Sequence, residues 1–338
     1  MMIFLMFLAL SQTSFSEEKK ADVIIGGSIF KEKEEGKNAE YVRGAICYLN
    51  KVIDSDPNII PKAIFYDNGN RPTRDLSNTR RLIFSDKASV LMGYSNMEGV
   101  LKSIEEAKKK DVVMAFPFVS LSQKDIDENS EDIFYLRPSI EKDLEALADF
   151  VNRHDVQKLA IVFEKEEEWQ KEYISELTKI VPSVFSYIKD PLSMNEALMD
   201  IKQLKPSHII ILGEQKGAIS FIKRAKFNGV DSTFILPFYL SNSEVNKKIK
   251  KYGVKVYSGK IFPNINSNNK TVKDYVKCSR KYEPDFEVGE SGLEGFITAK
   301  ILYSIIINSN MKDRKSMLES FKKIDLSSII KLRVEECE

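Results

Sequence analysis

Short apolar strands alternate with amphipathic helices along most of the chain, and this alternation constrains the fold more than any other feature. The clearest unit is the stretch 90–120. It opens with an apolar run at 90–92, breaks at Gly93, continues through a helix with one apolar face, and ends in a second strand at 112–116. Strands that alternate with helices in this way are typical of parallel sheets covered by helices on both faces.

The alternation restarts at Arg137, which indicates two units. With 338 residues, 43% of them hydrophobic, the chain is long enough for two moderate cores. Strands are expected at 22–26, 63–66, 90–92, 112–116, 134–136, 159–163, 184–187, 208–212, 233–236 and 254–257. Helices are expected at 39–53, 74–85, 140–153, 168–180, 193–204, 216–227, 243–251, 271–282, 291–309 and 312–322. The sequence therefore predicts an α/β fold with two doubly wound parallel-sheet lobes.

Two loops of the opening unit are candidates for ligand contact. Loops 93–99 and 117–122 both follow the carboxyl ends of neighbouring strands. In an open α/β sheet ligands bind at this edge. The amides of loop 93–99 also lie at a helix N-terminus, which favours an anionic group such as a carboxylate. The alternative is an ordinary strand–helix–strand unit with polar loops.

The N-terminus is apolar from Met1 to Leu10 and polar from Ser11 to Ser16. About ten apolar residues are too few to span a bilayer, which needs roughly twenty. The pattern is typical of a secretory signal, although its first residues lack Lys and Arg. We expect residues 1–16 to be a signal peptide and the mature protein to be periplasmic or extracellular. The alternative is a buried N-terminal strand.

Charge and cysteine content exclude several classes of protein. The 51 basic and 50 acidic residues leave a net charge of +1, so no field of one sign indicates a nucleic acid or an anionic membrane as partner. The cysteines Cys47, Cys278 and Cys337 are too widely spaced for a metal knuckle or a redox pair. Cys47 lies in an apolar run and is expected in the core. A bond between Cys278 and Cys337 depends on whether the fold brings them together.

Catalytic motifs are incomplete in this sequence. Of the two histidines, His208 opens an apolar strand and His154 lies in a polar loop. The glycines at 26–27 lack the third glycine of a dinucleotide fingerprint, and the glycines at 289 and 292 are one place too close for a nucleophile elbow. The polar stretch 125–129 is expected to be a loop and lacks the later residues of a calcium loop. We therefore predict no cofactor, no metal and no catalytic residue, and expect the protein not to be an enzyme.

Several segments follow one another in a recognisable order. They are Tyr66-Asp67, Gly69-Asn70, Arg81-Leu82-Ile83, Gly93, the segment 105–117, Phe134-Tyr135-Leu136-Arg137-Pro138-Ser139, and the stretch 294–302. In this order they resemble the type I periplasmic binding proteins of the leucine/isoleucine/valine branch, and the similarity covers about residues 22–331.

The resemblance implies two lobes joined by three crossings, which close on a small ligand. Crossings are expected near 137–138, 258–263 and 325–329. Lobe I would comprise residues 17–137 and 260–326, and lobe II residues 138–259 and 327–338. The family usually adds a further strand after the third crossing, where this chain has a polar tail. The implied partners are a small-molecule ligand and the permease subunits of an ABC transporter, and the implied state is a monomer.

The ligand-binding residues of the family carry over only in part. The resemblance places a ligand at Tyr94, Ser95, Asn96, Gly99, Phe118, Ser120, Trp169, Glu214 and Phe238. Gly99 occupies the position of a hydroxyl residue, and Phe238 that of the acidic residue that neutralises a ligand ammonium. An unpaired ammonium in a closed cleft costs several kcal/mol. Glu214, which stands at an aromatic position of the family, could neutralise the ligand ammonium from another wall of the cleft. Otherwise the site suits a less polar, aromatic or non-zwitterionic ligand. The alternative for Trp169 and Phe238 is lobe core or exposed loop.

Two functions follow from these observations. The first is an exported solute-binding protein of an ABC-type importer, whose ligand is an amino acid, an amide or a related compound. The second is a periplasmic interaction or sensor module of the same fold with a degenerate ligand site.

Overall fold

The structure is a computed structural model. It describes residues 21–31, 36–55, 59–154, 156, 158–164, 183–187, 191–309, 313–326 and 330–337. The predicted signal peptide, the predicted helix 168–180 and Trp169 lie outside the described residues.

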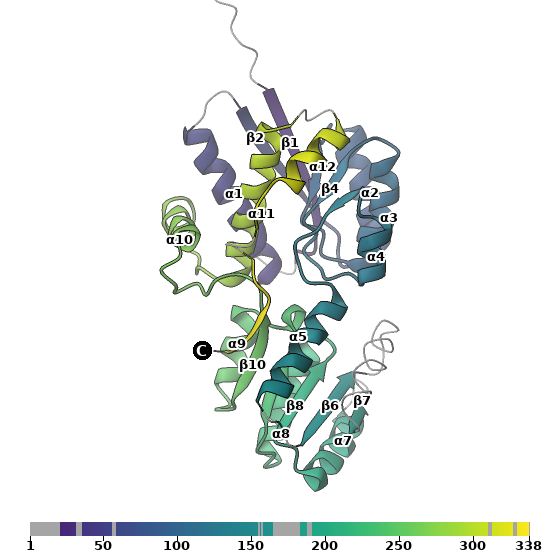
Figure 1. The fold of residues 1–338 in the computed structure, drawn as a ribbon, viewed down its shortest axis with the longest axis vertical. Helices are drawn as coiled ribbons and strands as arrows, with labels where there is room; N and C mark the ends of the chain where they lie inside the picture. The colour runs from purple at the N-terminus through teal and green to yellow at the C-terminus, as the bar shows by residue number, and fades with distance from the viewer. Residues whose placement is uncertain are drawn as a thin grey trace, which may run out of the picture.

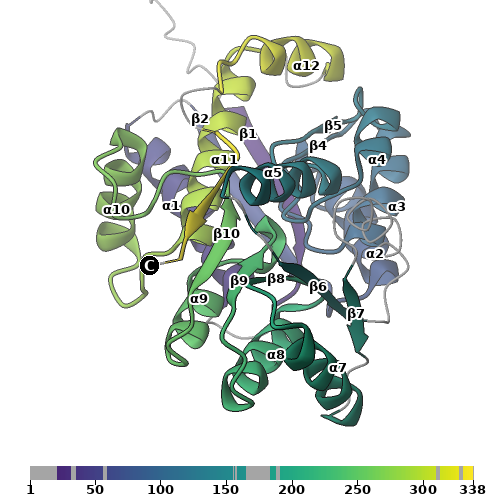
Figure 2. The ribbon, with the colours of Figure 1, turned by 60° about the horizontal axis from the view of Figure 1, so that its bottom comes forward.

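Lobe I is built on a sheet with the strand order β2-β1-β3-β4-β5, all of whose pairs are parallel. Its strands are β1 (Ala21–Ile29), β2 (Ile59–Asp67), β3 (Val90–Met92), β4 (Val113–Ala115) and β5 (Ile133–Phe134). Its helices are α1 (Lys37–Ser55), α2 (Pro72–Phe84), α3 (Met97–Lys108), α4 (Gln123–Glu128), α10 (Lys270–Tyr282), α11 (Glu290–Ile307) and α12 (Arg314–Lys322). Figures 1 and 2 show α1, α10 and α11 on one side of this lobe and α2 and α3 on the other, so the sheet has a core on each face.

Lobe II is built on a sheet with the order β11-β10-β9-β8-β6-β7. Its strands are β6 (Leu159–Glu164), β7 (Val184–Tyr187), β8 (His208–Leu212), β9 (Thr233–Leu236), β10 (Val256–Lys260) and β11 (Arg333–Glu336). All pairs are parallel except β10–β11. Its described helices are α5 (Ile140–Arg153), α7 (Pro191–Leu204), α8 (Gln215–Phe227), α9 (Ser243–Lys250) and the 3₁₀ turn η1 (Phe238–Leu240). The two-lobed α/β fold predicted from the sequence is confirmed.

The sequence of α5 explains why this helix forms where it was predicted. Its apolar residues Leu144, Leu147 and Val151 recur at helical spacing and are buried. The side chain of Ser139 accepts a hydrogen bond from the amide of Lys142 and so caps the N-terminus, at 3.2 Å. The observed bounds of α5, residues 140–153, are those expected from the pattern.

Three segments connect the lobes, because the chain leaves lobe I after β5, returns after β10 and leaves again before β11. The second and third segments run side by side. The amide of Lys331 donates to the carbonyl of Ile261 at 3.0 Å, and the guanidinium of Arg333 donates to the carbonyl of Phe262 at 2.7 Å. The exact lobe bounds stay a prediction.

Two local expectations were wrong, and the open question of the cysteine pairing is answered. Residues 123–128 form helix α4, capped by Ser122, instead of a polar loop. The tail after residue 332 forms β11, which pairs antiparallel with β10 as an edge strand. Cys278 bonds to the buried Cys47 and not to Cys337, so the disulfide ties α10 to α1. The strand and the disulfide depend on tertiary contacts that local patterns do not encode, whereas α4 has few apolar residues to indicate a helix.

Helices α1 and α11 approach each other closely through glycines. A Cβ on Gly44 would lie 1.9 Å from the carbonyl oxygen of Gly292, and a Cβ on Gly295 would lie 2.0 Å from that of Tyr41. At the same contact the carboxylate of Glu40 accepts the amide of Gly292 at 2.9 Å, and its burial raises its pKa to about 7. This packing fixes the N-terminus of α11 beside the segments that connect the lobes.

In the described part of the chain, no helix combines the length and the apolar character that a membrane span requires.

Candidate functional site

A buried ion pair lies where the first connecting segment meets α11. The guanidinium of Arg137 donates two hydrogen bonds to the carboxylate of Glu294, at 2.6 and 2.9 Å. The two side chains are only 9% and 7% exposed, so the pair is shielded from water. Bidentate pairs of this kind are strong and set the orientation of both partners.

Aromatic rings from both lobes pack on the same guanidinium. Its central carbon lies 4.1 Å from the ring centroid of Phe118 and 5.3 Å from that of Phe238. Phe118 follows β4 in lobe I, and Phe238 follows β9 in lobe II. Arg137 is therefore a contact that the carboxyl edges of both sheets share, held by cation–π attraction on each side.

A second ion pair continues this arrangement along α11. The ammonium of Lys260, at the end of β10, lies 2.7 and 2.8 Å from the two carboxylate oxygens of Glu290 and 3.3 Å from the hydroxyl of Ser241. Glu290 and Glu294 are four residues apart and so lie on one face of α11. We call the group Phe118, Arg137, Phe238, Lys260, Glu290 and Glu294 the hinge site.

The hinge site surrounds a small cavity of about 40 Å³. Its polar neighbours include Lys37, Gln215, Ser241, Asn242 and Ser291. Elements of both lobes line it, which is the position expected for a ligand between two sheets.

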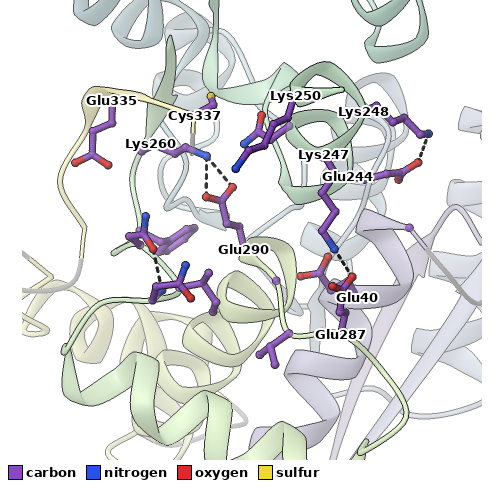
Figure 3. Close-up of a pocket in the computed structure, with 18 of the residues that line it drawn as sticks. Glu40, Glu244, Lys247, Lys248, Lys250, Lys260, Glu287, Glu290, Glu335 and Cys337 are labelled. Carbon is purple, nitrogen blue, oxygen red and sulfur yellow. Dashed lines mark hydrogen bonds and ion pairs between the residues drawn. The ribbon is translucent and has the colours of Figure 1, made fainter. Parts of the chain in front are cut away.

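A wide groove of about 1140 Å³ adjoins this cavity and shares Lys260, Phe262 and Glu290 with it (Figure 3). Lysines of α9 lie on its lobe II wall, and acidic residues of α1 and of the loop before α11 lie on its lobe I wall. An ion pair between Lys247 and Glu287 spans the two walls. Most of the charges in the groove therefore pair with each other.

The predicted ligand loop of lobe I is engaged in contacts within its own lobe. Tyr94 is fully buried, and its hydroxyl lies 2.7 Å from that of Thr79. The hydroxyl of Ser95 accepts the amide of Phe30 at 2.9 Å. The side chain of Asn96 accepts the amide of Gly99 at 2.9 Å and caps α3.

Asp75 holds this edge of lobe I together. Its carboxylate accepts hydrogen bonds from Ser28 at 2.6 Å and from Asn68 at 3.0 Å, and Asn68 also reaches Ser95 at 3.4 Å. A Cβ on Gly99 would lie 2.0 Å from Asp75 Oδ2, so a hydroxyl residue at this position would not fit. Burial raises the pKa of Asp75 to about 6.

The other predicted residues fall into two groups. Phe118 and Phe238 come together at the hinge site, and Ser120 is buried close to Phe118 in the chain. Glu214 is exposed at the start of α8, where its amide donates to the carboxylate of Glu164 at 3.0 Å. Contact of any of these residues with a ligand stays a prediction.

Sequence reasoning missed Arg137, Lys260, Glu290 and Glu294 as site residues. Helix α11 is almost wholly apolar and buried. The two carboxylates on its first turns, Glu290 and Glu294, were the sequence signal that could have indicated a site. Their partners lie far away in sequence, 157 residues for Arg137. Among the described residues, no three His, Cys, Asp or Glu side chains are grouped as metal ligands.

The two sheets, the three connecting segments and a cavity lined by both lobes define a two-lobed binding protein. The chain belongs to the periplasmic binding protein family, whose model matches residues 62–331. No curated protein sequence matches the chain.

Solved structures share this fold at low sequence identity. An extracellular ligand-binding receptor from Verminephrobacter eiseniae is 14% identical, with a TM-score of 0.78 over 93% of this chain and 97% of that one. A branched-chain amino acid transporter substrate binding protein from Streptococcus pneumoniae, in complex with isoleucine, is 13% identical, with a TM-score of 0.74 over 90% and 88%. A solute binding protein of an ABC transporter from R. palustris, in complex with benzoate, is 15% identical, with a TM-score of 0.75 over 94% of each chain.

Proposed function

We propose that this protein is an exported, monomeric solute-binding protein that takes up a small ligand between its lobes and delivers it to the permease subunits of an ABC importer. The observation that carries the proposal is the meeting of Phe118 and Phe238, from opposite lobes, at a cavity beside the connecting segments. A ligand held there would contact both lobes and so stabilise one relative orientation of them.

Export is supported by the apolar N-terminal segment and by the Cys47–Cys278 disulfide. Such bonds persist in oxidising compartments and are rare in the cytosol. We propose cleavage of the signal peptide near Ser16.

The charges of the hinge site point to a ligand without an ammonium group. Glu290 and Glu294 each have a bidentate cationic partner, and Phe238 stands where the resemblance expects an acidic residue. An ammonium would have to displace Lys260 or Arg137 from its carboxylate. We therefore favour amides and apolar or aromatic carboxylates over zwitterionic amino acids.

The test is thermal unfolding of the mature protein against branched, aromatic and acidic amino acids, short amides, urea and aromatic carboxylates. A ligand at about a thousand times its dissociation constant adds roughly 4 kcal/mol, which raises the unfolding midpoint by several degrees. A shift with amides or carboxylates alone supports the proposal. A shift with zwitterionic amino acids alone contradicts the proposed ligand class.

An interaction or sensor module is the second candidate, because internal ion pairs fill the hinge site and the lobe I loop is tied to its own lobe. No shift with any ligand, together with capture of an envelope partner other than a permease, would favour it.

A further inference from the structure

Asp143 lies directly behind the lobe II wall of the hinge site. It belongs to the first turn of α5 and is 1% exposed. Its Oδ2 atom accepts the amide of Phe238 at 2.7 Å. Phe238, whose ring packs on Arg137, is the first residue of the turn Phe238–Leu240. Its amide bonds to the buried carboxyl group of Asp143, so the position of this ring depends on that group.

Asp143 packs closely against the backbone of β10 and of the turn. A Cβ on Gly259, which lines the cavity, would lie 2.7 Å from Asp143 Oδ1 and 2.9 Å from the amide nitrogen of Phe238. Among the described residues, no hydrogen-bond partner faces Asp143 Oδ1. A proton on this oxygen would therefore find no acceptor there.

Burial is the main influence on this carboxyl group and raises its pKa to about 7, while the amides of Phe238 and Tyr239 act in the opposite direction. Other titratable groups on the elements packed around it have their own engagements. Glu141 accepts the amide of Gln123, Lys142 is exposed, the hydroxyl of Tyr239 accepts the amide of Gly213, Lys260 pairs with Glu290, and Arg333 pairs with Glu335.

We propose that Asp143 is a positioning residue that holds the Phe238–Leu240 turn against the cleft when ionised and loosens it when protonated. The ionised group accepts charge-assisted hydrogen bonds, which are about twice as strong as neutral ones. The inference rests on the proposed function, since it makes ligand affinity fall as the pH drops from 8 to 6.

Hydrogen exchange of the ligand-free protein tests this role without any ligand. After correction for the intrinsic exchange rate, the Phe238 amide, followed in a peptide spanning residues 237–241, should be about tenfold better protected at pH 8 than at pH 6, as its charge-assisted bond to Asp143 becomes a neutral one. Equal protection at the two pH values in the wild type would overturn the proposal.

Two variants separate positioning from a general effect of buried carboxyl groups. D143N should show the same protection at both pH values. D75N removes a carboxyl group that is equally buried but lies in lobe I, and should keep the wild-type difference in the turn. A D75N protein that loses the difference would overturn the proposal, and this control remains informative if D143N does not fold. A flat ligand panel with a pH-dependent turn would reject the proposed function and retain the role of Asp143.

Discussion

The two lobes hold the loops at the carboxyl edges of their sheets in different ways. In lobe I, the side chain of Asp75 joins those of Ser28 and Asn68, and Asp67 accepts the amides of Lys31 and Gly69. In lobe II, carboxylates bond to backbone amides, Glu164 to that of Glu214 and Asp143 to that of Phe238. Several side chains therefore hydrogen-bond to one another at the lobe I edge, whereas each of these two lobe II loops is held in place by one acidic group.

The cores show the same contrast. Lobe I has a disulfide between α1 and α10 and a glycine-mediated contact between α1 and α11. Lobe II ends its sheet with the short antiparallel strand β11. We infer that lobe I is the rigid platform, and that adjustment to ligand and pH takes place in lobe II.

The largest effect on the free energy of unfolding is expected from removing Arg137, whose guanidinium contacts both lobes. Arg137→Ala leaves Glu294 buried without its cation, which should lower the free energy of unfolding by about 3–5 kcal/mol. Urea denaturation measures the loss. The double variant R137M/E294L removes both charges and should recover most of the stability. A loss below about 1 kcal/mol in R137A would show that the buried pair is not needed for stability.

Removing the disulfide tests the rigidity of lobe I. C47A/C278A should lower the free energy of unfolding by about 2–5 kcal/mol, because the bond links residues 231 positions apart and restricts the unfolded chain. Hydrogen exchange should locate the loss of protection in α1 and α10. C337A, the matched control, should have little effect, and equal losses in both lobes would contradict the contrast.

The alternation of strands and helices was enough to predict most of this fold. The helix at 140–153 and the strands at 159–163 and 208–212 are predicted almost to the residue, because the helix has apolar residues at helical spacing and each strand is a short, mostly continuous run of buried apolar residues. The stretch 123–128 and the strand at 333–336 were missed, since a capped polar turn and an edge strand carry few apolar residues.

The site was less predictable than the fold. The resemblance brought Phe118 and Phe238 to the cleft, but the hydroxyl of Tyr94 bonds within the lobe I core. The function of Arg137 and Asp143 depends on partners 157 and 95 residues away. Burial of a charged group is decided by the whole fold, so no local pattern marks these residues.

The pH dependence of stability sharpens the comparison of the two edges. The pKa of Asp75 is raised to about 6 and that of Asp143 to about 7, whereas an unfolded Asp titrates near pH 4. Between these values the folded state binds more protons at Asp75 and Asp143, and also at Glu40, whose pKa is raised to about 7. These three groups make the free energy of unfolding fall as the pH rises from about 4 to 7 and then level off, while His208, whose pKa is lowered by burial, acts in the opposite direction. Calorimetry from pH 4 to 8 measures this curve.

Single variants assign the two parts of that curve. D75N should flatten it mainly below pH 6, and D143N should flatten it up to about pH 7. Global unfolding solvates Asp143, so its ionised form costs global stability. Opening of the turn alone is expected to leave Asp143 buried without the Phe238 amide, so this local opening is less favourable at high pH. A D75N or D143N curve that keeps the wild-type slope would contradict the corresponding assignment.

The smallest effect is expected at the ion pair that spans the wide groove. Lys247 and Glu287 are 58% and 82% exposed, so E287Q should change the free energy of unfolding by less than about 1 kcal/mol, and salt should screen even that. E290Q is the matched comparison, because Lys260 and Glu290 are only 12% and 28% exposed. Its loss should be larger and less sensitive to salt. Denaturation of both variants at low and high salt measures the difference. Equal losses would show that burial does not strengthen the Lys260–Glu290 ion pair. The three connecting segments and apolar contacts would then account for how the lobes are held together.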